Sequence, residues 1–339
     1  MVRASIAWLI FASWACGRGE TASPERSLER SPSATVAGAA RTPDEVALPR
    51  DLVRADPGRV VAIGDLHGDL SSTRAVLRLA GAIDVRERWI GGRLVVVHTG
   101  DSIDRGPDDR AVLDLLDRLR DEALAAGGEL ILLSGNHELM NVAQDFRYVN
   151  PAGDAAFGGA AGRARAFLPG GSYARRVATR PLFVQVGDSM FVHGGILPEH
   201  VAYGLARLDR ETRAWVRGER SAMPEPLAAD DGPVWTRAYS ADPQSADCAA
   251  LREVLARLGA RRMVVGHTVQ AQGINAACDG QVWRIDVGLA TTYGGPLQVL
   301  EIVGGAPRVL QGARADLGTA EHVEGEPRAT QPPRVSPAP

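Results

Sequence analysis

Five short stretches of the sequence bring carboxylates, an amide and imidazoles next to glycine. They read GDLHGD (64–69), GDSIDRG (100–106), GNHE (135–138), VHGG (192–195) and GHT (266–268). Each follows or ends an apolar run that is typical of a buried strand. Gathering so many ionisable groups in one place costs free energy through repulsion and desolvation unless cations compensate. Together they predict a metal site, although ordinary turn chemistry explains any single one.

The candidate ligands in these stretches are oxygen and imidazole groups, without a thiolate. This mixture suits Mn, Fe or Zn, and we expect two divalent metal ions, with Mn as the first choice. Asp101 is the natural bridge, because one carboxylate can offer an oxygen to each of two ions. Two ions about 3.5–4 Å apart can clamp the oxygens of an in-line displacement and lower the pKa of bound water. This chemistry fits phosphoryl transfer, in which positioning and charge stabilisation dominate.

The elements that must hold these stretches alternate between strands and helices. Apolar runs predict strands at 59–64, 92–100, 129–135, 261–266, 281–288 and 297–303, and a hairpin at 181–195. Helical periodicity predicts helices at 72–83 and 109–128. The alternation indicates an α/β fold with a parallel central sheet, which binds ligands at the carboxyl ends of its strands. Residues 141–180 and 200–247 have less regular patterns, and we expect loops there that form a substrate-facing edge.

In this order the motifs resemble those of the calcineurin-like metallophosphoesterases. They are most similar to the phosphoprotein phosphatase branch, which carries GDxHG, GDxxDRG and GNHE. The longer strings LLSGNHELMNV and RRMVVGHTVQ, with VWRIDVG further on, resemble the Shewanella-like protein phosphatases. The resemblance spans about residues 58–303. It implies an α/β fold with a central β-sandwich flanked by helices, in a metallophosphoesterase domain at 50–310.

The resemblance also implies a role for the motif residues. The first metal ion would be held by Asp65, His67 and the bridging Asp101, and the second by Asp101, Asn136, His193 and His267. His137 would protonate the leaving-group oxygen, and Asp104 would orient its imidazole and keep it charged. The phosphate would be bound by Arg105, Asn136 and Arg237, of which Arg237 could instead be an ordinary surface arginine. Glu138 is expected behind the ligands and Asp286 along the wall of the site.

The implied function is a metal-dependent phosphomonoesterase. It would hydrolyse phosphoserine, phosphothreonine or phosphotyrosine in proteins by direct attack of a hydroxide bound to both metal ions. An alternative places a nucleotide or a dinucleoside polyphosphate on the same centre. A third reading, a metal-binding module without activity, is disfavoured because His137, Asp104 and every expected ligand are present.

The ends of the chain differ from its middle. The sequence MVR followed by ASIAWLIFASWA has the pattern of an export signal, which we place at 1–15, and is shorter than the about 20 residues that span a bilayer. Cys16 follows it directly, so a lipid anchor there would be this chain's one contact with a membrane. Residues 16–48 and 312–339 are poor in large apolar residues and predict a disordered linker and tail. We therefore expect an exported protein of the periplasm or cell envelope.

Composition and cysteines add two further expectations. The chain is 45% apolar and 23% charged, as soluble globular proteins are, and its net charge of −3 with a pI near 6.2 argues against a nucleic-acid partner. Besides Cys16, the chain contains Cys248 and Cys278. In an exported protein these two would form a disulfide, and otherwise they would be two unpaired thiols.

Overall fold

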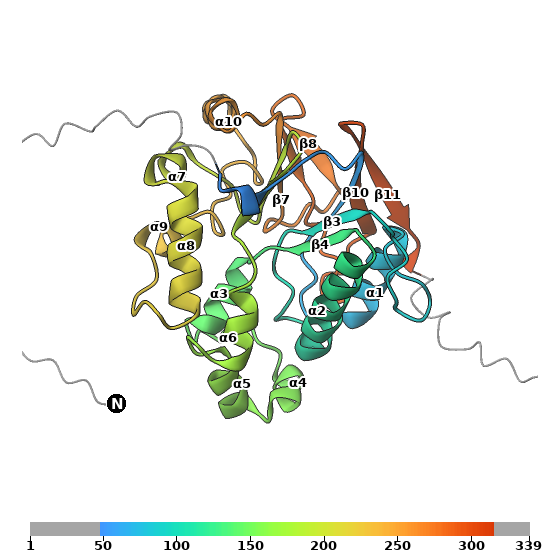
Figure 1. The fold of residues 1–339 in the computed structure, drawn as a ribbon, viewed down its shortest axis with the longest axis vertical. Helices are drawn as coiled ribbons and strands as arrows, with labels where there is room; N and C mark the ends of the chain where they lie inside the picture. Colours follow the sequence, from blue (N-terminus) through green and yellow to red (C-terminus); the bar gives the residue numbers. More distant parts are fainter. Residues whose placement is uncertain (1–47, 315–339) are drawn as a thin grey trace, which may run out of the picture. The chain divides into compact units, whose positions relative to one another are not determined.

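Two mixed β-sheets form the centre of the fold (Figure 1). The computed structural model describes residues 48–314, so the predicted signal peptide at 1–15, Cys16, nearly all of the predicted linker at 16–48 and the predicted tail beyond 314 lie outside the described residues. The first sheet has the order β1 (Val53–Arg54), β5 (Phe183–Val186), β6 (Ser189–Val192), β7 (Arg262–Val265), β9 (Val282–Arg284), β8 (Asn275–Ala277). The second has the order β11 (Ala306–Gly312), β10 (Leu297–Val303), β2 (Arg59–Ile63), β3 (Val95–His98), β4 (Glu129–Leu132).

The inner faces of the two sheets share one apolar core. Alternate residues along each strand point to opposite faces of its sheet. In β2, Val60 and Ala62 pack in the same cluster as Phe191 of β6 and Val264 of β7. The two sheets therefore pack face to face, as in a β-sandwich.

Helices cover the outer faces of both sheets. Val61 and Ile63, the outward residues of β2, pack with Val76 of α1 and Val112 of α2. On the other sheet the outward residues of β6 and β7 pack with α8 and α10. The helices are α1 (Leu70–Leu79), α2 (Asp109–Ala125), α3 (Asn136–Val142), α4 (Pro151–Asp154), α5 (Ala160–Phe167), α6 (Ser172–Val177), α7 (Pro198–Tyr203), α8 (Leu205–Val216), α9 (Glu225–Ala228) and α10 (Ser245–Leu258), with single 3₁₀ turns at Arg50–Leu52 and Ala155–Phe157. No helix between residues 48 and 314 is long and apolar enough to span a bilayer.

The predicted strands and the first two helices are present, but the segments between them differ from the prediction. The strands β2, β3 and β4 are parallel, whereas β10 and β11 add an antiparallel edge. The expectation of loops at 141–180 and 200–247 is wrong, because α4, α5 and α6 lie in the first segment and α7, α8 and α9 lie in the second. The domain also continues to Gly312 in β11, whereas the sequence predicts its end at 310.

A disulfide ties α10 to the end of β8. It joins Cys248 and Cys278, whose Cα atoms are 5.3 Å apart and which are separated by 30 residues. Because this bond restricts the unfolded chain, we expect Cys248→Ser/Cys278→Ser to lower the free energy of unfolding by about 2–4 kcal/mol. Urea denaturation of the double variant and of the oxidised wild type measures the difference. An unchanged denaturation midpoint would contradict this expectation.

Candidate active site

The five motifs converge where the two sheets meet. The strands β2, β3 and β4 deliver residues from one sheet, and β6 and β7 deliver residues from the other. The backbone N–H of His267 donates to the Asp65 carboxylate at 3.2 Å, which joins the two sheets at this point. The centre gathers all six residues that the sequence predicts as metal ligands, namely Asp65, His67, Asp101, Asn136, His193 and His267. All six are at least nine-tenths buried.

The backbone of the centre is held in an unusual conformation. The residues with positive φ include His67 (46°), Asp101 (58°), Asp104 (70°), Arg105 (68°) and His267 (67°). A non-glycine residue stays in this left-handed region only where the surrounding structure imposes it, and such residues cluster at functional sites. Close packing adds a constraint at Gly135, where a Cβ would lie 2.1 Å from Asp101 Oδ1. Only glycine therefore lets the start of α3 approach this carboxylate.

One oxygen of Asp101 is the common point of two candidate metal sets. Its Oδ2 lies 3.3 Å from His193 Nε2 and 4.0 Å from His67 Nε2. The two sets of closely spaced ligand atoms are His67, Asp101 and His137, and Asp101, His193 and His267. The other oxygen, Oδ1, accepts a hydrogen bond from the backbone N–H of His137 at 2.9 Å. Asp101 thus lies between the two sets and would be the residue that both ions share.

Three imidazoles are oriented so that a lone pair faces the centre. His67 and His193 each place Nδ1 near a backbone carbonyl, at 3.2 Å and 3.1 Å, and His267 places Nε2 near another at 3.0 Å. A carbonyl only accepts, so the nitrogen facing it carries the proton and the opposite nitrogen can bind a cation. Burial lowers the pKa of His67 to about 4 and that of His267 to about 3, which keeps both rings neutral.

The buried carboxylates of the centre are costly in their ionised form unless a positive charge compensates them. Burial, together with the charges of Asp286 and Asp101, holds the pKa of Asp65 well above its usual range. Burial also raises the pKa of Asp286 to about 6. For Asp101 the nearby imidazoles outweigh burial and lower the pKa. Buried carboxylates, a carboxamide and neutral imidazoles form a donor set for divalent cations, so these residues fit the predicted metal ions.

Glu138 supports the motif backbones and does not face the centre. Its Oε1 accepts from the N–H of Ser102 at 2.7 Å, and its Oε2 accepts from the N–H groups of Asp101 and Gly135 at 3.0 Å and 2.8 Å. This places Glu138 behind the ligands, as the sequence predicts. Asp286 is also buried, and its Oδ1 accepts from the N–H of Gly288 at 2.9 Å.

His137 differs from the other three imidazoles because a carboxylate lies behind it. Its Nδ1 donates to Asp104 Oδ2 at 2.7 Å, and its Nε2 lies 3.8 Å from Asp101 Oδ2. Burial lowers the pKa of His137, but the charges of Asp101 and Asp104 outweigh burial and raise it above its ordinary value. The surroundings of His137 therefore favour the protonated form, in contrast to those of His67 and His267.

Asn141 completes the His137–Asp104 pair and was not predicted from the sequence. Its Nδ2 donates to both oxygens of Asp104 at 3.0 Å and to the backbone carbonyl of His137 at 2.9 Å. The sequence NHELMN does contain a signal, because residues four apart lie on the same face of a helix. His137 and Asn141 could thus have been paired once α3 was recognised.

Two arginines lie beside the centre. The Arg105 guanidinium stacks over the Tyr148 ring at 4.0 Å, and its buried Nε has no hydrogen-bond partner within residues 48–314. Arg237 is exposed, and its Nη1 donates to the His267 carbonyl at 2.9 Å and to Thr268 Oγ1 at 2.8 Å. Because a guanidinium has five N–H donors, both side chains keep donors for an anion.

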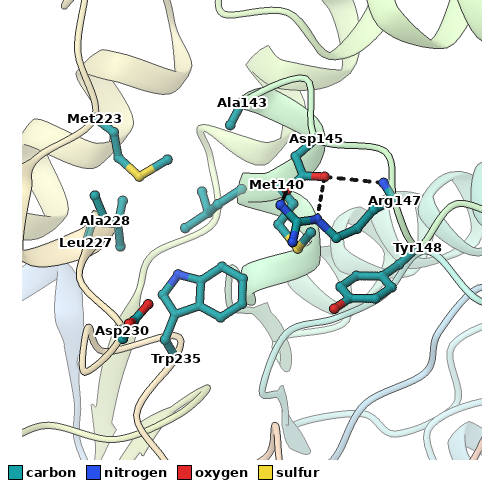
Figure 2. A pocket seen from close by; sticks show the side chains of 11 residues that line it. Met140, Ala143, Asp145, Arg147, Tyr148, Met223, Leu227, Ala228, Asp230 and Trp235 are labelled. Carbon is teal, nitrogen blue, oxygen red and sulfur yellow. Dashed lines mark hydrogen bonds and ion pairs between the residues drawn. The ribbon is translucent and has the colours of Figure 1, made fainter. Parts of the chain in front are cut away.

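An apolar cavity adjoins His137. Its volume is ≈ 380 Å³, and its lining comes from α3, from the segment that follows α3, from α9 and from residues on both sides of α9. Figure 2 shows Trp235 at one side of the cavity and the ion pair of Asp145 and Arg147 at another. The Tyr148 ring also lines the cavity and lies 5.2 Å from the His137 ring, measured between centroids. The full lining is Leu139, Met140, Ala143, Asp145, Arg147, Tyr148, Met223, Leu227, Ala228, Asp230 and Trp235.

Both the sequence and the fold are similar to those of phosphatases. Residues 58–271 match the family model described as calcineurin-like phosphoesterase. Shewanella-like protein phosphatase 2 of Arabidopsis thaliana is 38% identical, over 73% of this chain and 75% of that protein. Shewanella-like protein phosphatase 1 of Plasmodium berghei (strain Anka) is 32% identical, over 70% of each. The cold-active protein-tyrosine phosphatase of a psychrophile, Shewanella sp., has a similar fold, with a TM-score of 0.64 at 24% identity over 79% of this chain and 84% of that one. These similarities confirm the predicted fold class.

Proposed function

The chain belongs to the calcineurin-like phosphoesterase family, and on that premise we propose that it hydrolyses phosphate monoesters of phosphoproteins, with His137 as the general acid. The observation that carries this proposal is the contrast among the four imidazoles. Three of them are backed by carbonyls and offer a lone pair to the centre. His137 is backed by the Asp104 carboxylate, which favours a proton on the ring. One imidazole thus supplies a proton, whereas the other three are oriented to act as metal ligands.

In this reaction His137 protonates the oxygen of the leaving group. The P–O bond to the serine, threonine or tyrosine oxygen is cleaved, and that oxygen takes the proton from His137 Nε2. The oxygen of a water forms the new bond to phosphorus, and a proton from this water restores the imidazole. Asp104 keeps the other nitrogen, Nδ1, protonated and fixes the ring plane, so that Nε2 faces the reacting atoms.

The phosphate is bound beside the metal ligands. Arg105 stacks over Tyr148 with a buried Nε that lacks a partner within the described range. Arg237 adds donors from a loop, and Asn136 adds its Nδ2 from the start of α3. When bound, two divalent cations, Mn by our proposal, would supply positive charge to the phosphate and lower the pKa of water. One would be held by Asp65, His67 and Asp101, and the other by Asp101, Asn136, His193 and His267.

The surroundings of the centre favour a polypeptide substrate. An apolar side chain that flanks the phosphorylated residue can be buried in the cavity against Trp235 and Met223, which contributes about 25 cal/mol for each Å² removed from water. A nucleotide polyphosphate would instead need additional positively charged side chains to bind its further phosphates. In the cavity, however, Arg147 is paired with Asp145, and Asp230 is a second acidic residue. The lining therefore carries one net negative charge, which disfavours additional phosphates.

A substrate panel tests this proposal. With Mn added, we expect kcat/KM for phosphopeptides to exceed that for ATP and for a dinucleoside tetraphosphate by at least about tenfold, equivalent to about 1.4 kcal/mol of transition-state binding. The phosphopeptides should carry phosphoserine, phosphothreonine or phosphotyrosine in one sequence context, which also measures the preference among them. Faster turnover of either nucleotide would favour the alternative activity on the same centre.

We also propose that the protein is exported to the periplasm or cell envelope. The apolar stretch before Cys16 supports this, as does the disulfide of Cys248 and Cys278, because such bonds persist in oxidising compartments. Cell fractionation of the full chain, compared with a chain that lacks residues 1–15, tests export. A Cys16→Ala variant that still partitions with membranes would exclude the lipid anchor.

A further inference from the structure

Arg163 of α5 is a fully buried cation beneath the His137–Asp104 pair. Its side chain is 1% exposed and has a partner for each nitrogen. Nε donates to Asn141 Oδ1 at 2.8 Å, Nη1 to Asp109 Oδ2 at 2.6 Å, and Nη2 to Asp104 Oδ1 at 2.7 Å. A buried charge is costly unless it is fully paired, so this arrangement holds all its members in one geometry.

The network leads directly to the imidazole. Asp104 uses Oδ1 for Arg163 and Oδ2 for His137 Nδ1. Asp109, the second anion, accepts the backbone N–H of Asp104 at 2.8 Å through its Oδ1. The Asp104 carboxylate is therefore fixed from its side chain and from its backbone. Any change at Arg163 reaches His137 through a single intervening residue.

Arg163 itself stays away from the substrate. The rings of Phe157 and Phe167 lie 5.2 Å and 5.4 Å from its guanidinium carbon, and Arg163 does not line the cavity beside His137. Its charge also offsets one of the two buried carboxylates, Asp104 and Asp109. Arg163 can thus affect the reaction only through the groups that it holds.

We propose that Arg163 is a positioning residue for the general acid. It fixes the orientation of the Asp104 carboxylate, so that His137 presents the Nε2 proton to the leaving-group oxygen. This inference rests on the proposed function, because it requires His137 to be the acid. Helix α5, which lies in a segment predicted to be a loop, then contributes to catalysis through the buried side chain of Arg163.

Leaving-group dependence separates positioning from a purely structural role. Phenyl phosphate releases a basic oxygen that needs the proton, whereas p-nitrophenyl phosphate releases a stable anion that needs it little. For Arg163→Met we expect kcat for phenyl phosphate to fall by about 10²-fold, the usual cost of a misplaced catalytic group. For p-nitrophenyl phosphate we expect a fall of less than about threefold, with KM nearly unchanged for both esters, since no substrate contact is lost. Arg165→Met, an exposed arginine of the same helix, is the matched control and should resemble the wild type.

A double-mutant cycle completes the test. In the His137→Asn background, Arg163→Met should cause no further loss, because the group through which it acts is already absent. Equal losses for both esters, or additive losses in the cycle, would overturn the positioning role and leave the proposed function intact. If His137→Asn itself shows no leaving-group dependence, the acid assignment fails first. Should Arg163→Met not fold, Arg163→Lys keeps the charge with a single nitrogen. The ratio of the kcat losses for the two esters then distinguishes a positioning role from a structural one in the same way.

Discussion

Asp101→Asn is expected to remove both divalent cations and to abolish phosphatase activity. Asp101 Oδ1 accepts from the backbone N–H of His137 at 2.9 Å, and the single oxygen of an asparagine would remain there. Its NH₂ group would then replace Oδ2, which lies 3.3 Å from His193 Nε2 and 4.0 Å from His67 Nε2. An amide NH₂ donates and does not bind cations, so both ligand sets lose the member that they share. We expect kcat/KM to fall by at least about 10³-fold, more than removal of a single oxyanion donor costs.

Elemental analysis after loading with Mn and gel filtration measures this effect directly. The wild type should retain about two equivalents for each chain, as a two-metal phosphatase site requires. Asp121→Asn is a suitable control, because this carboxylate lies on α2 with 79% of its side chain exposed. If Asp101→Asn kept one full equivalent, Asp101 would belong to one ion only and would not bridge. Far-UV circular dichroism distinguishes metal loss from unfolding.

The metal ligands could be predicted because the sequence shows two signals at the ends of the strands, namely polar residues directly after an apolar run and glycines beside them. VVAIG before Asp65 and ILLSG before Asn136 indicate buried strands, and the polar residues that follow have few structural uses in a core. The glycines supply the second signal, since they mark where backbones approach closely. A Cβ at Gly266, for example, would lie 2.4 Å from Asp65 Oδ1. Parallel pairing of β2, β3 and β4 then brings the first three motifs to one edge.

The helices between residues 151 and 177 could not be predicted, because they lack an apolar stripe. In α5, with the sequence AAGRARAF, the buried residues are Gly162, Arg163 and Phe167. A buried arginine counts as polar in any hydrophobicity pattern, so the segment resembles a loop. What stabilises this helix in place is an ion-pair network whose partners, Asp104 and Asp109, precede it by more than fifty residues. Only the tertiary structure brings these residues together.

The same limit applies to the four histidines of the centre. His67, His137, His193 and His267 all lie beside motif glycines after predicted strands, so their local sequence does not separate a ligand from an acid. In the structure their hydrogen-bond partners differ, since Asp104 backs His137 and backbone carbonyls back the other three. Yet a carboxylate can also orient a metal-binding imidazole, and His137 is a member of one candidate metal set. Geometry alone therefore permits two roles for His137, which a single substitution distinguishes.

His137→Asn is expected to lower kcat steeply while both metal ions remain bound. The substitution removes the proton that Nε2 delivers, and the loss of a general acid costs about 10²–10⁴-fold. It removes no ligand under the proposed assignment, so the metal content should match that of the wild type. The loss should be largest for phosphoserine and phenyl phosphate and smallest for p-nitrophenyl phosphate, because their oxygens differ in the need for a proton.

His67→Asn is the matched comparison for this variant. The two rings lie 4.8 Å apart between centroids and belong to the same candidate metal set. Under the proposed assignment, His67→Asn loses metal from one set and is partly restored by excess Mn, whereas His137→Asn keeps its metal and does not respond to added Mn. If His137→Asn instead loses one equivalent and recovers activity with Mn, His137 is a ligand. The Asp104 carboxylate would then serve to increase the basicity of that ligand, and the source of the proton would have to lie elsewhere in the centre.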